Sequence, residues 1–481
     1  MKNHLLTFCA SASFSLLVAC SGQPGEVKSY NEGINIIPMP QSLVQQQGAF
    51  RLSGSTSLGA ASPEAKTIAE FFAAKMRTAT GYDITVGESG NITLKLDESL
   101  DVNDEGYQLD VTGDAVNVTA KTPQGLFYGM QTFMQLLPAE IESAQKVSGI
   151  AWTAQAVSIK DEPRFGYRGI MLDPCRHFMP AENVKKFIDV LSLFKINRLH
   201  WHLTDDQGWR IEIKKYPKLT TVGGYRKKTI VGYMWDNPTE WDTKRYGGFY
   251  TQEDIKEVVA YAKKRFVEII PEIEMPGHSV AALTAYPEYS CTGGPFEVEG
   301  RWGVFNDIYC TKESTFTFMQ DILDEVVKLF PFSYIHLGGD EAPRIRWKNC
   351  VHCQERMKQE HLTKEAELQT YFINRIENYL NARGKKIIGW DEILEGGIPQ
   401  RATVMSWRGE KGGIHAEKAG YDVIMSPNIY MYFNCFQFKG NGRKIGNPNR
   451  VITLEKAYNY HPVPEALTAD EAKHIKGVQA N

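Results

Sequence analysis

The sequence lacks an excess of either charge. Its 481 residues carry 54 Lys and Arg against 57 Asp and Glu, which gives a formal net charge of −3 at pH 7. Proteins that bind nucleic acids or anionic membrane surfaces usually show a basic excess or basic runs. This balance gives no argument for either partner, and we predict that the protein binds no nucleic acid.

The sequence also lacks the motifs of common cofactor and metal sites. No GxGxxG follows a first strand, so nothing supports a dinucleotide-binding sheet. Cys350-Val-His-Cys353 has the spacing of half a zinc site, but no second CxxC or HxxxH follows at zinc spacing. A local disulfide or two free thiols are expected there instead, and Cys291 and Cys310 form another candidate bridge. We predict no cofactor and no metal ion.

An apolar run near the amino terminus, residues 5–19, is too short to span a bilayer with a loop to follow. It predicts a secretory signal over residues 1–19. Leu17-Val-Ala-Cys20 resembles a bacterial lipoprotein cleavage box, in which Cys20 becomes the lipidated first residue, although an ordinary signal with a chance Cys is the alternative. Polar residues 20–33 then form a tether. We expect an exported lipoprotein, periplasmic or on the cell surface, held by its lipid at the outer membrane of a Gram-negative bacterium.

Residues 34–158 mix short strand patterns with helical ones. Apolar alternation predicts strands at 92–96 and 116–120, and apolar residues at helical spacing predict helices over 64–76 and 125–137. The apolar face of the second helix reads as a packing surface. We expect a small α+β domain without chemistry of its own.

Residues 163–481 show a regular alternation of strands and amphipathic helices. We predict seven strands, at 169–172, 198–203, 267–273, 334–337, 386–390, 403–407 and 422–425. The clearest helices are predicted over 181–194, 252–265, 315–330 and 363–382. Repeated βα units with polar clusters after each strand favour a TIM (β/α)8-type barrel whose site lies at the carboxyl ends of the strands, with an open doubly wound sheet as the alternative.

The stretch Ser333–Glu341 organises this larger segment. A short apolar run ends in two glycines, and Asp340 and Glu341 follow directly. Adjacent carboxylates at the mouth of a barrel strand repel one another, so that one can hold a proton while its partner stays an anion. This arrangement predicts a pair for acid–base chemistry, although a solvated turn of the same composition is an ordinary surface feature.

Four segments carry a family resemblance, in the family's order along the chain. They are Arg168-Gly-Ile-Met-Leu-Asp173, His202-Leu-Thr-Asp205-Asp206-Gln-Gly-Trp-Arg210, Pro276-Gly-His278 and His336-Leu-Gly-Gly-Asp340-Glu341. Together they resemble the signatures of glycoside hydrolase family 20, the β-N-acetylhexosaminidases. The resemblance implies a TIM barrel after a small domain, and an exo-acting enzyme that removes terminal GlcNAc or GalNAc from oligosaccharides or glycoconjugates.

The resemblance also implies a retaining mechanism in which the substrate's own 2-acetamido oxygen attacks the anomeric carbon and forms an oxazolinium ion. Glu341 then matches the general acid/base, and Asp340 matches the residue that orients the acetamido group. His278 matches a histidine behind the acid that pairs with Asp205, with the adjacent Asp206 as an alternative.

Substrate contacts follow from the same resemblance. Arg168 matches an arginine that binds sugar hydroxyls, while Trp390 and Trp407 match tryptophans that enclose the N-acetyl methyl. Tyr432 matches a tyrosine that bonds the acetamido carbonyl. Asn434 stands where the family commonly has Asp, which bears on the preference for GlcNAc or GalNAc.

Two features keep other functions open. Gly477–Asn481 looks like the beginning of an eighth strand, so we expect a barrel incomplete at strand 8 and a chain truncated before the segment that usually supplies a further Trp and Glu. A sugar-binding relative without activity is therefore one alternative. His200-x-His202 suggests another, a metal-dependent amidohydrolase barrel, although there the motif belongs on the first strand and here it falls on the second.

Overall fold

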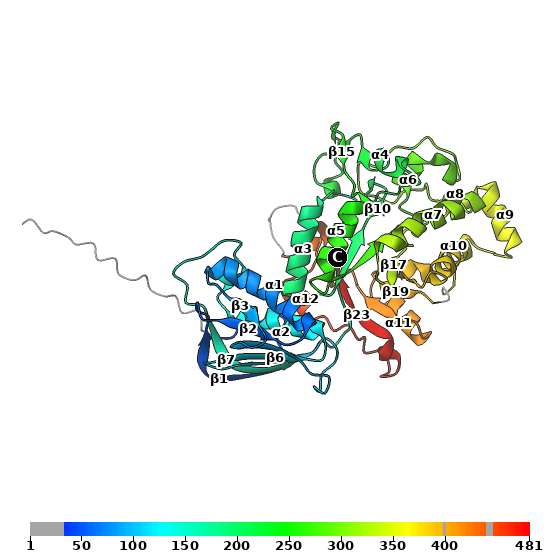
Figure 1. Ribbon diagram of the computed structural model, residues 1–481. Coiled ribbons are helices and arrows are strands. Elements are labelled where there is room, and N and C mark those ends of the chain that lie inside the picture. Colours follow the sequence, from blue (N-terminus) through cyan, green and yellow to red (C-terminus); the bar gives the residue numbers. More distant parts are fainter. Residues whose placement is uncertain (1–32, 398–400, 439–445) are drawn as a thin grey trace, which may run out of the picture. The chain divides into compact units, whose positions relative to one another are not determined.

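The computed structural model describes residues 33–397, 401–438 and 446–481, and the chain divides into two compact units between Asp161 and Glu162 (Figure 1). The expected signal segment, the lipidation site Cys20 and residues 20–32 of the tether lie outside the described residues. Within the described ranges, no helix combines the length and apolar composition needed to cross a membrane.

The first unit is a seven-stranded mixed sheet with two helices. Its strands occur in the spatial order β1-β7-β5-β6-β4-β2-β3. Their bounds are β1 (Ser42–Arg51), β2 (Ser57–Ala60), β3 (Thr85–Gly87), β4 (Ile92–Leu96), β5 (Tyr107–Val111), β6 (Val116–Ala120) and β7 (Thr153–Asp161). The helices α1 (Pro63–Thr80) and α2 (Pro123–Leu136) pack on each other through Phe72 and Phe127. The buried, apolar face of α2 agrees with a packing role.

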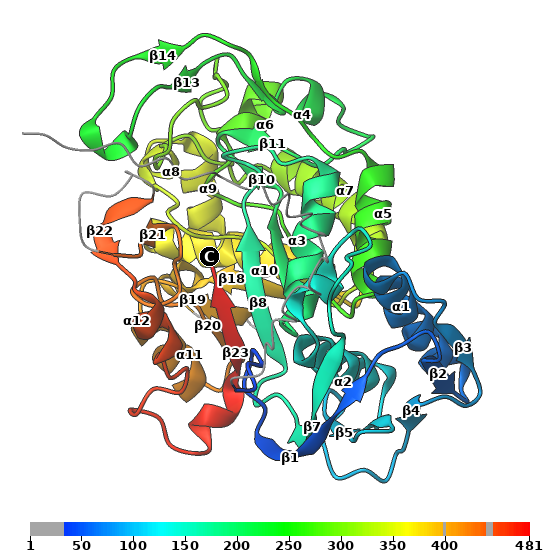
Figure 2. The same ribbon diagram turned by 90° about the vertical axis from the view of Figure 1, so that its left-hand side faces the viewer.

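The second unit is a closed barrel of eight parallel strands, as Figure 2 shows for β8, β23, β20 and β19. Their bounds are β8 (Tyr167–Leu172), β9 (Arg198–His202), β16 (Glu268–Glu272), β17 (Tyr334–His336), β18 (Lys386–Trp390), β19 (Thr403–Ser406), β20 (Val423–Met425) and β23 (Ile475–Ala480). All seven predicted strands occur in it, and the predicted TIM-type fold is confirmed.

The prediction that the barrel is incomplete at strand 8 is wrong. β23 pairs with β20 through Gly477 and Ile424, and with β8 through Gly477 and Tyr167. Pairing on both sides satisfies the backbone groups that an open edge would expose, which is the physical reason a short final run is enough to close the barrel.

Helices cover the outside of the barrel, and loops at the carboxyl ends of the strands carry further small elements. The covering helices are α3 (Ala181–Leu193), α5 (Gln252–Lys263), α7 (Glu313–Leu329), α10 (Glu365–Asn381) and α11 (Lys411–Lys418). The other helices are α4 (Lys218–Thr221), α6 (Val280–Ala285), α8 (Ile345–Lys348), α9 (Val351–Gln359) and α12 (Leu454–Tyr458). Short strand pairs are formed by β10 (Thr204–Asp205) with β11 (Gly208–Trp209), β12 (Tyr225–Arg226) with β15 (Tyr246–Gly247), β13 (Thr229–Ile230) with β14 (Trp241–Asp242), and β21 (Cys435–Phe436) with β22 (Asn447–Val451).

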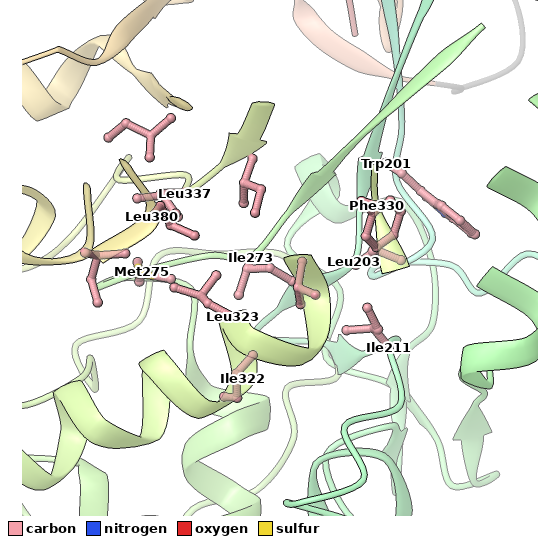
Figure 3. Packing of buried hydrophobic residues seen from close by; sticks show 14 of the residues in the cluster. Trp201, Leu203, Ile211, Ile273, Met275, Ile322, Leu323, Phe330, Leu337 and Leu380 are labelled. Carbon is pink, nitrogen blue, oxygen red and sulfur yellow. The ribbon is translucent and has the colours of Figure 1, made fainter. Parts of the chain in front are cut away.

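The core follows the period-two alternation of the barrel strands. Outward-facing side chains such as Trp201 and helix residues such as Ile322 and Leu323 belong to one buried cluster, part of which Figure 3 shows. Inward-facing apolar residues, including Ile270 and Ile388, form a separate layer inside the barrel. Because successive residues point to opposite faces, the same strands that pack outward also send polar side chains such as His200 and His202 inward.

Candidate active site

The Gly-Gly turn after β17 places the two adjacent carboxylates. Gly338 and Gly339 have φ values of +66° and +87°, a conformation that residues with a Cβ rarely adopt. A Cβ on Gly338 would lie 1.6 Å from the Glu274 carboxylate, and one on Gly339 would lie 2.5 Å from Ile393. Only glycine fits, and the turn brings Asp340 and Glu341 to the carboxyl end of the barrel, as predicted.

Both carboxylates line a cavity of about 540 Å³ at this end of the barrel. The cavity is rich in aromatic and charged side chains from the loops that follow the strands. Its polar and aromatic lining consists of Asp173, Arg176, His202, Tyr233, Trp235, Trp302, Asp340, Glu341, Trp390, Trp407, Tyr432, Asn434, Asn447, Arg450 and Asn481. A cavity of this size and composition suits a sugar ring, which offers hydroxyls at its edge and C–H groups on its faces.

His278 lies directly behind the two acids. Its Nε2 is 3.6 Å from Oδ2 of Asp340 and 3.6 Å from Oε2 of Glu341. Burial by itself would lower the pKa of His278, but the charge of Asp205 and hydrogen bonds with Asp205, Asp206 and Asp340 raise that pKa well above its ordinary value. A cationic imidazole between the carboxylates and the barrel interior partly neutralises the negative charge that the pair concentrates.

Both aspartates named for His278 lie beside it. Nδ1 of His278 is 2.9 Å from Asp206 and 3.4 Å from Asp205, so Asp206 makes the closer contact. Asp205 is engaged elsewhere, because its Oδ2 lies 2.6 Å from the Arg176 guanidinium and 2.9 Å from His202. His278 therefore pairs with both aspartates, and Asp206 makes the shorter hydrogen bond.

The arginine of the pocket is Arg176, and the assignment of Arg168 to substrate is wrong. Arg168 stands at the amino end of β8 and donates to the carbonyls of Phe165 and Lys195. It does not belong to the cavity lining, because a barrel strand carries its first and last residues to opposite ends of the barrel. Arg176, beyond the carboxyl end of the same strand, lines the cavity and pairs with Asp173 at 2.9 Å.

Trp390, Trp407 and Tyr432 form an aromatic wall of the cavity, as their assignment predicts. The rings of Trp407 and Tyr432 are stacked with centroids 6.0 Å apart. Both indole N–H groups are directed to carboxylates, Trp390 to Glu272 at 2.9 Å and Trp407 to Glu392 at 2.7 Å. Because their polar edges are already bonded, these rings offer apolar surface to a ligand. Burial and the charge of Asp340 raise the pKa of Tyr432 well above its ordinary value, which keeps its hydroxyl a donor.

Glu392 is a site residue to which the sequence analysis assigned no role. Its carboxylate accepts from Trp407 and, at 3.4 Å, from the backbone N–H of Glu341. Burial and the charge of Asp340 raise the pKa of Glu392 to about 8. Its place after β18, next to a tryptophan already assigned to the pocket, is the signal that could have identified it.

Asn434 lines the cavity, as expected, together with residues of the loops around it. Tyr233 donates to the carbonyl of Gly446 at 2.6 Å and so joins two of these loops. Trp235 and Trp302 lie with ring centroids 5.8 Å apart at the cavity. Tyr233, Trp235, Trp302 and Arg450 carry no motif, and only the tertiary structure brings them to the site.

A buried carboxylate organises the floor below the site. Glu272 lies 3.1 Å from His200, 2.5 Å from His202 and 2.9 Å from His336, and it also accepts from Trp390. The charges of these histidines outweigh burial and lower the pKa of Glu272. Both histidines of the His200-x-His202 motif thus lie beside one carboxylate in the barrel interior. Of the two histidines, only His202 reaches the cavity lining.

The fold and this site define a closed α/β barrel that carries two adjacent acids after its fourth strand. The family model "Glycosyl hydrolase family 20, catalytic domain" matches residues 165–481, and "Glycosyl hydrolase family 20, domain 2" matches residues 33–162. The chain belongs to glycosyl hydrolase family 20.

Individual relatives agree with this family. A β-hexosaminidase of Porphyromonas gingivalis is 47% identical over all of this chain, which spans 61% of that protein's length. The structure of the β-N-acetylhexosaminidase of Streptomyces coelicolor superposes with a TM-score of 0.79 at 32% identity, covering 92% of this chain and 85% of that one. A mutant β-hexosaminidase of Streptomyces plicatus in complex with product, GlcNAc, gives the same TM-score at 31% identity, covering 92% of this chain and 84% of that one.

Proposed function

We propose that the protein is an exo-acting β-N-acetylhexosaminidase that releases terminal GlcNAc or GalNAc from oligosaccharides or glycoconjugates. The observation that carries this proposal is the arrangement of Asp340 and Glu341, adjacent in sequence, on one side of a cavity whose wall is Trp390, Trp407 and Tyr432. A sugar with an acetamido group suits this cavity, because the carboxylates can bind its polar groups and the aromatic wall can contact its methyl group.

The carboxylates of the cavity favour a substrate-assisted reaction. Enzymes that use a protein nucleophile place two carboxyl groups about 5–5.5 Å apart across the anomeric carbon. Among the cavity-lining residues that the structure describes, the carboxylates are Asp173, Asp340 and Glu341, and Asp173 is paired with Arg176. The remaining two are neighbours on one turn, so we assign the attack on the anomeric carbon to the substrate's acetamido oxygen.

Asp340 is placed to hold the acetamido group. Its buried Oδ1 has no hydrogen-bond partner within the described part of the chain, although it lies at the cavity. An acetamido N–H donated to that oxygen would satisfy it, and the Tyr432 hydroxyl would donate to the acetamido carbonyl. The aromatic wall would enclose the methyl group, which is worth about 1 kcal/mol when fully buried.

Glu341 is the general acid and base of the proposed reaction. Its carboxyl group gives a proton to the glycosidic oxygen as the bond from that oxygen to the anomeric carbon breaks, and the acetamido oxygen bonds to the same carbon. A water molecule then attacks the anomeric carbon, the bond between that carbon and the acetamido oxygen breaks, and the water gives a proton to the Glu341 carboxylate. The sugar is released with its β configuration. Positive charge that develops on the acetamido group is stabilised by the Asp340 carboxylate.

The test compares two aryl glycosides that differ only in the 2-substituent. The nitrophenyl β-glycoside of GlcNAc should be hydrolysed at least about 10³-fold faster than that of glucose, because only the former carries the internal nucleophile. Equal rates would overturn the mechanism. Hydrolysis of neither would favour a sugar-binding relative without activity.

We also propose that Cys20 carries a lipid that holds the exported chain at the outer membrane of a Gram-negative bacterium, as the cleavage-box resemblance suggests. Metabolic labelling with a fatty acid should label the full-length protein, and Cys20→Ser should abolish the label. Cys9→Ser, within the signal segment, is the matched control and should keep it. Label retained in Cys20→Ser would contradict the anchor.

A further inference from the structure

Four cysteines from distant parts of the barrel unit meet at one point beside the active-site loops. Cys291 and Cys310 belong to the segment between β16 and α7, and Cys350 and Cys353 lie at the beginning of α9. Their sulfur atoms all lie within 4.8 Å of one another. The sequence shows only one CxxC pair, and the fold supplies the other two sulfurs.

The distances between these sulfurs match a single tetrahedral ion. A zinc ion bound by four thiolates at about 2.3 Å holds neighbouring sulfurs about 3.8 Å apart. The Sγ–Sγ distances are 3.7 Å for Cys291 and Cys353, 3.7 Å for Cys310 and Cys350, and 3.6 Å for Cys310 and Cys353. Four sulfur ligands in a tetrahedral arrangement are a donor set that zinc prefers.

Pairing Cys291 with Cys353 and Cys310 with Cys350 accounts for two of these contacts but leaves the third, between Cys310 and Cys353, unexplained. Cys310 is about as close to Cys350 as to Cys353, and Cys353 also contacts Cys291. Each cysteine is a free thiol in the structure. Two disulfides would have to choose among contacts of nearly equal length, whereas one central ion uses all of them at once.

The surroundings resemble those of a structural metal site. Cys310, Cys350 and Cys353 are buried, and they pack in an apolar cluster with Ile308 and Trp347. Thiols release their protons when they bind a metal cation as thiolates.

We propose that Cys291, Cys310, Cys350 and Cys353 bind one structural zinc ion, each as a thiolate whose proton is released to solvent. With four protein ligands the site is closed, so it has no open position for substrate. Its role is to join two loops. The β16–α7 segment carries His278, and the β17–α10 segment carries Asp340 and Glu341.

Other contacts join the same two loops and show where the ion would act. Trp347 Nε1 donates to the carbonyl of Tyr309 at 2.8 Å, and Arg346 pairs with Asp307 at 2.8 Å. A zinc ion beside these contacts would hold the loop of Glu341 against the loop of His278. The zinc ion would thus position these two loops for the proposed reaction and would not contact the sugar.

The direct test is the metal content of the full chain, purified without chelator from cells supplied with Zn²⁺. We expect one zinc ion per chain by elemental analysis, and release of that zinc in step with the titration of four thiols by a mercurial. Co²⁺ in its place should give the intense visible absorption of tetrahedral thiolate ligation. These readouts do not depend on hydrolytic activity, so they separate this proposal from the proposed function.

Variants locate the ion. Cys353→Ser should lower the zinc content to below roughly one tenth of an ion per chain, and Cys350→His, which keeps a zinc ligand, should retain most of it. Cys435→Ser removes a buried cysteine outside the cluster and should leave the zinc content unchanged. The proposal is overturned by a native chain that carries no zinc, whether its cysteines are free or cross-linked in peptide mapping, or by full zinc content in Cys353→Ser.

Discussion

The two ends of strand β8 carry one arginine each, and the two side chains have different tasks. Arg168, at the amino end, donates to the backbone carbonyls of Phe165 and Lys195. Arg176, beyond the carboxyl end, binds the carboxylates of Asp173 and Asp205 and lines the cavity. The backbone carbonyls at the amino end hold the Arg168 side chain in place. At the other end, Arg176 and Asp173 are charged groups of the cavity lining, where a ligand can reach them.

The comparison extends to the acids of neighbouring strands. Glu268, at the amino end of β16, pairs with Arg198 at the surface. Glu341, after the carboxyl end of β17, lines the cavity near His278. The barrel therefore separates groups that stabilise the fold from groups available for chemistry, and the difference lies in position along the strand, not in residue type.

Replacing one acid at each end of the barrel tests this difference with the largest expected effect. Glu341→Gln keeps the shape of the side chain but cannot transfer a proton, and we expect kcat/KM on the aryl GlcNAc glycoside to fall by roughly 10²–10⁴-fold. Glu268→Gln, the matched control, should stay within about twofold, because Glu268 lies at the amino end of its strand and does not line the cavity. Near-normal turnover in Glu341→Gln would contradict the role of Glu341 as the general acid.

The two arginines give the next largest effect. Arg176→Lys loses the planar fork that reaches Asp173 and Asp205, and we expect kcat/KM to fall by roughly 10–100-fold with little change in unfolding temperature. Arg168→Lys should show the reverse, a lower unfolding temperature with nearly unchanged kcat/KM. Steady-state kinetics and thermal unfolding of both variants measure this, and a kinetic loss in Arg168→Lys would contradict the division between the ends.

Tyr432→Phe tests the aromatic wall with a smaller expected effect. It keeps the ring stacked on Trp407 and removes the hydroxyl, which remains a donor because its pKa is raised by burial. Loss of one hydrogen bond worth about 1 kcal/mol predicts a fall in kcat/KM of roughly five- to tenfold on a GlcNAc glycoside. Trp407→Phe is a useful companion because it alters stacking without removing that hydroxyl. An unchanged kcat/KM in Tyr432→Phe would contradict a hydrogen bond between this tyrosine and the substrate.

The last prediction concerns the dependence of stability on pH. Folded Glu392 keeps its proton up to about pH 8, whereas an unfolded glutamate loses it near pH 4.5. The folded state therefore binds more protons between these values, and the contribution of Glu392 to stability falls as pH rises, by at most about 1.4 kcal/mol per pH unit.

Glu392→Gln should remove this slope. Denaturant unfolding at several pH values should show that the free energy of unfolding of the variant increases relative to that of the parent chain as pH rises from 4.5 to 8. A constant difference between the two chains across that range would show that Glu392 does not hold its proton in the folded state.

Much of the site could be predicted because motifs stand at strand ends. An apolar run followed by Gly338 and Gly339 marks the end of β17, and the acids that follow have to lie at the mouth of the barrel. Trp390 ends β18, and Trp407 and Tyr432 follow β19 and β20. The residues missed, Tyr233, Trp235 and Trp302 among them, lie on long loops whose course local sequence patterns do not determine.

The errors and open choices arose where two residues of one type compete for a role. Arg168 and Arg176 stand near the same strand, and Asp205 and Asp206 are neighbours, so residue type alone could not separate them. The eighth strand was misjudged for another reason: its few residues form a weak pattern, and their stability comes from pairing with β20 and β8.

By itself, the sequence determined the βα alternation, the barrel and the turn that presents Asp340 and Glu341, because these depend on periodicity and on glycine's backbone freedom. Only the tertiary structure decided which arginine faces the cavity, which aspartate makes the shorter hydrogen bond with His278, and that Cys291 and Cys310 meet Cys350 and Cys353. These outcomes depend on distances between segments far apart in the chain, which strand pairing and loop packing set and no local pattern encodes.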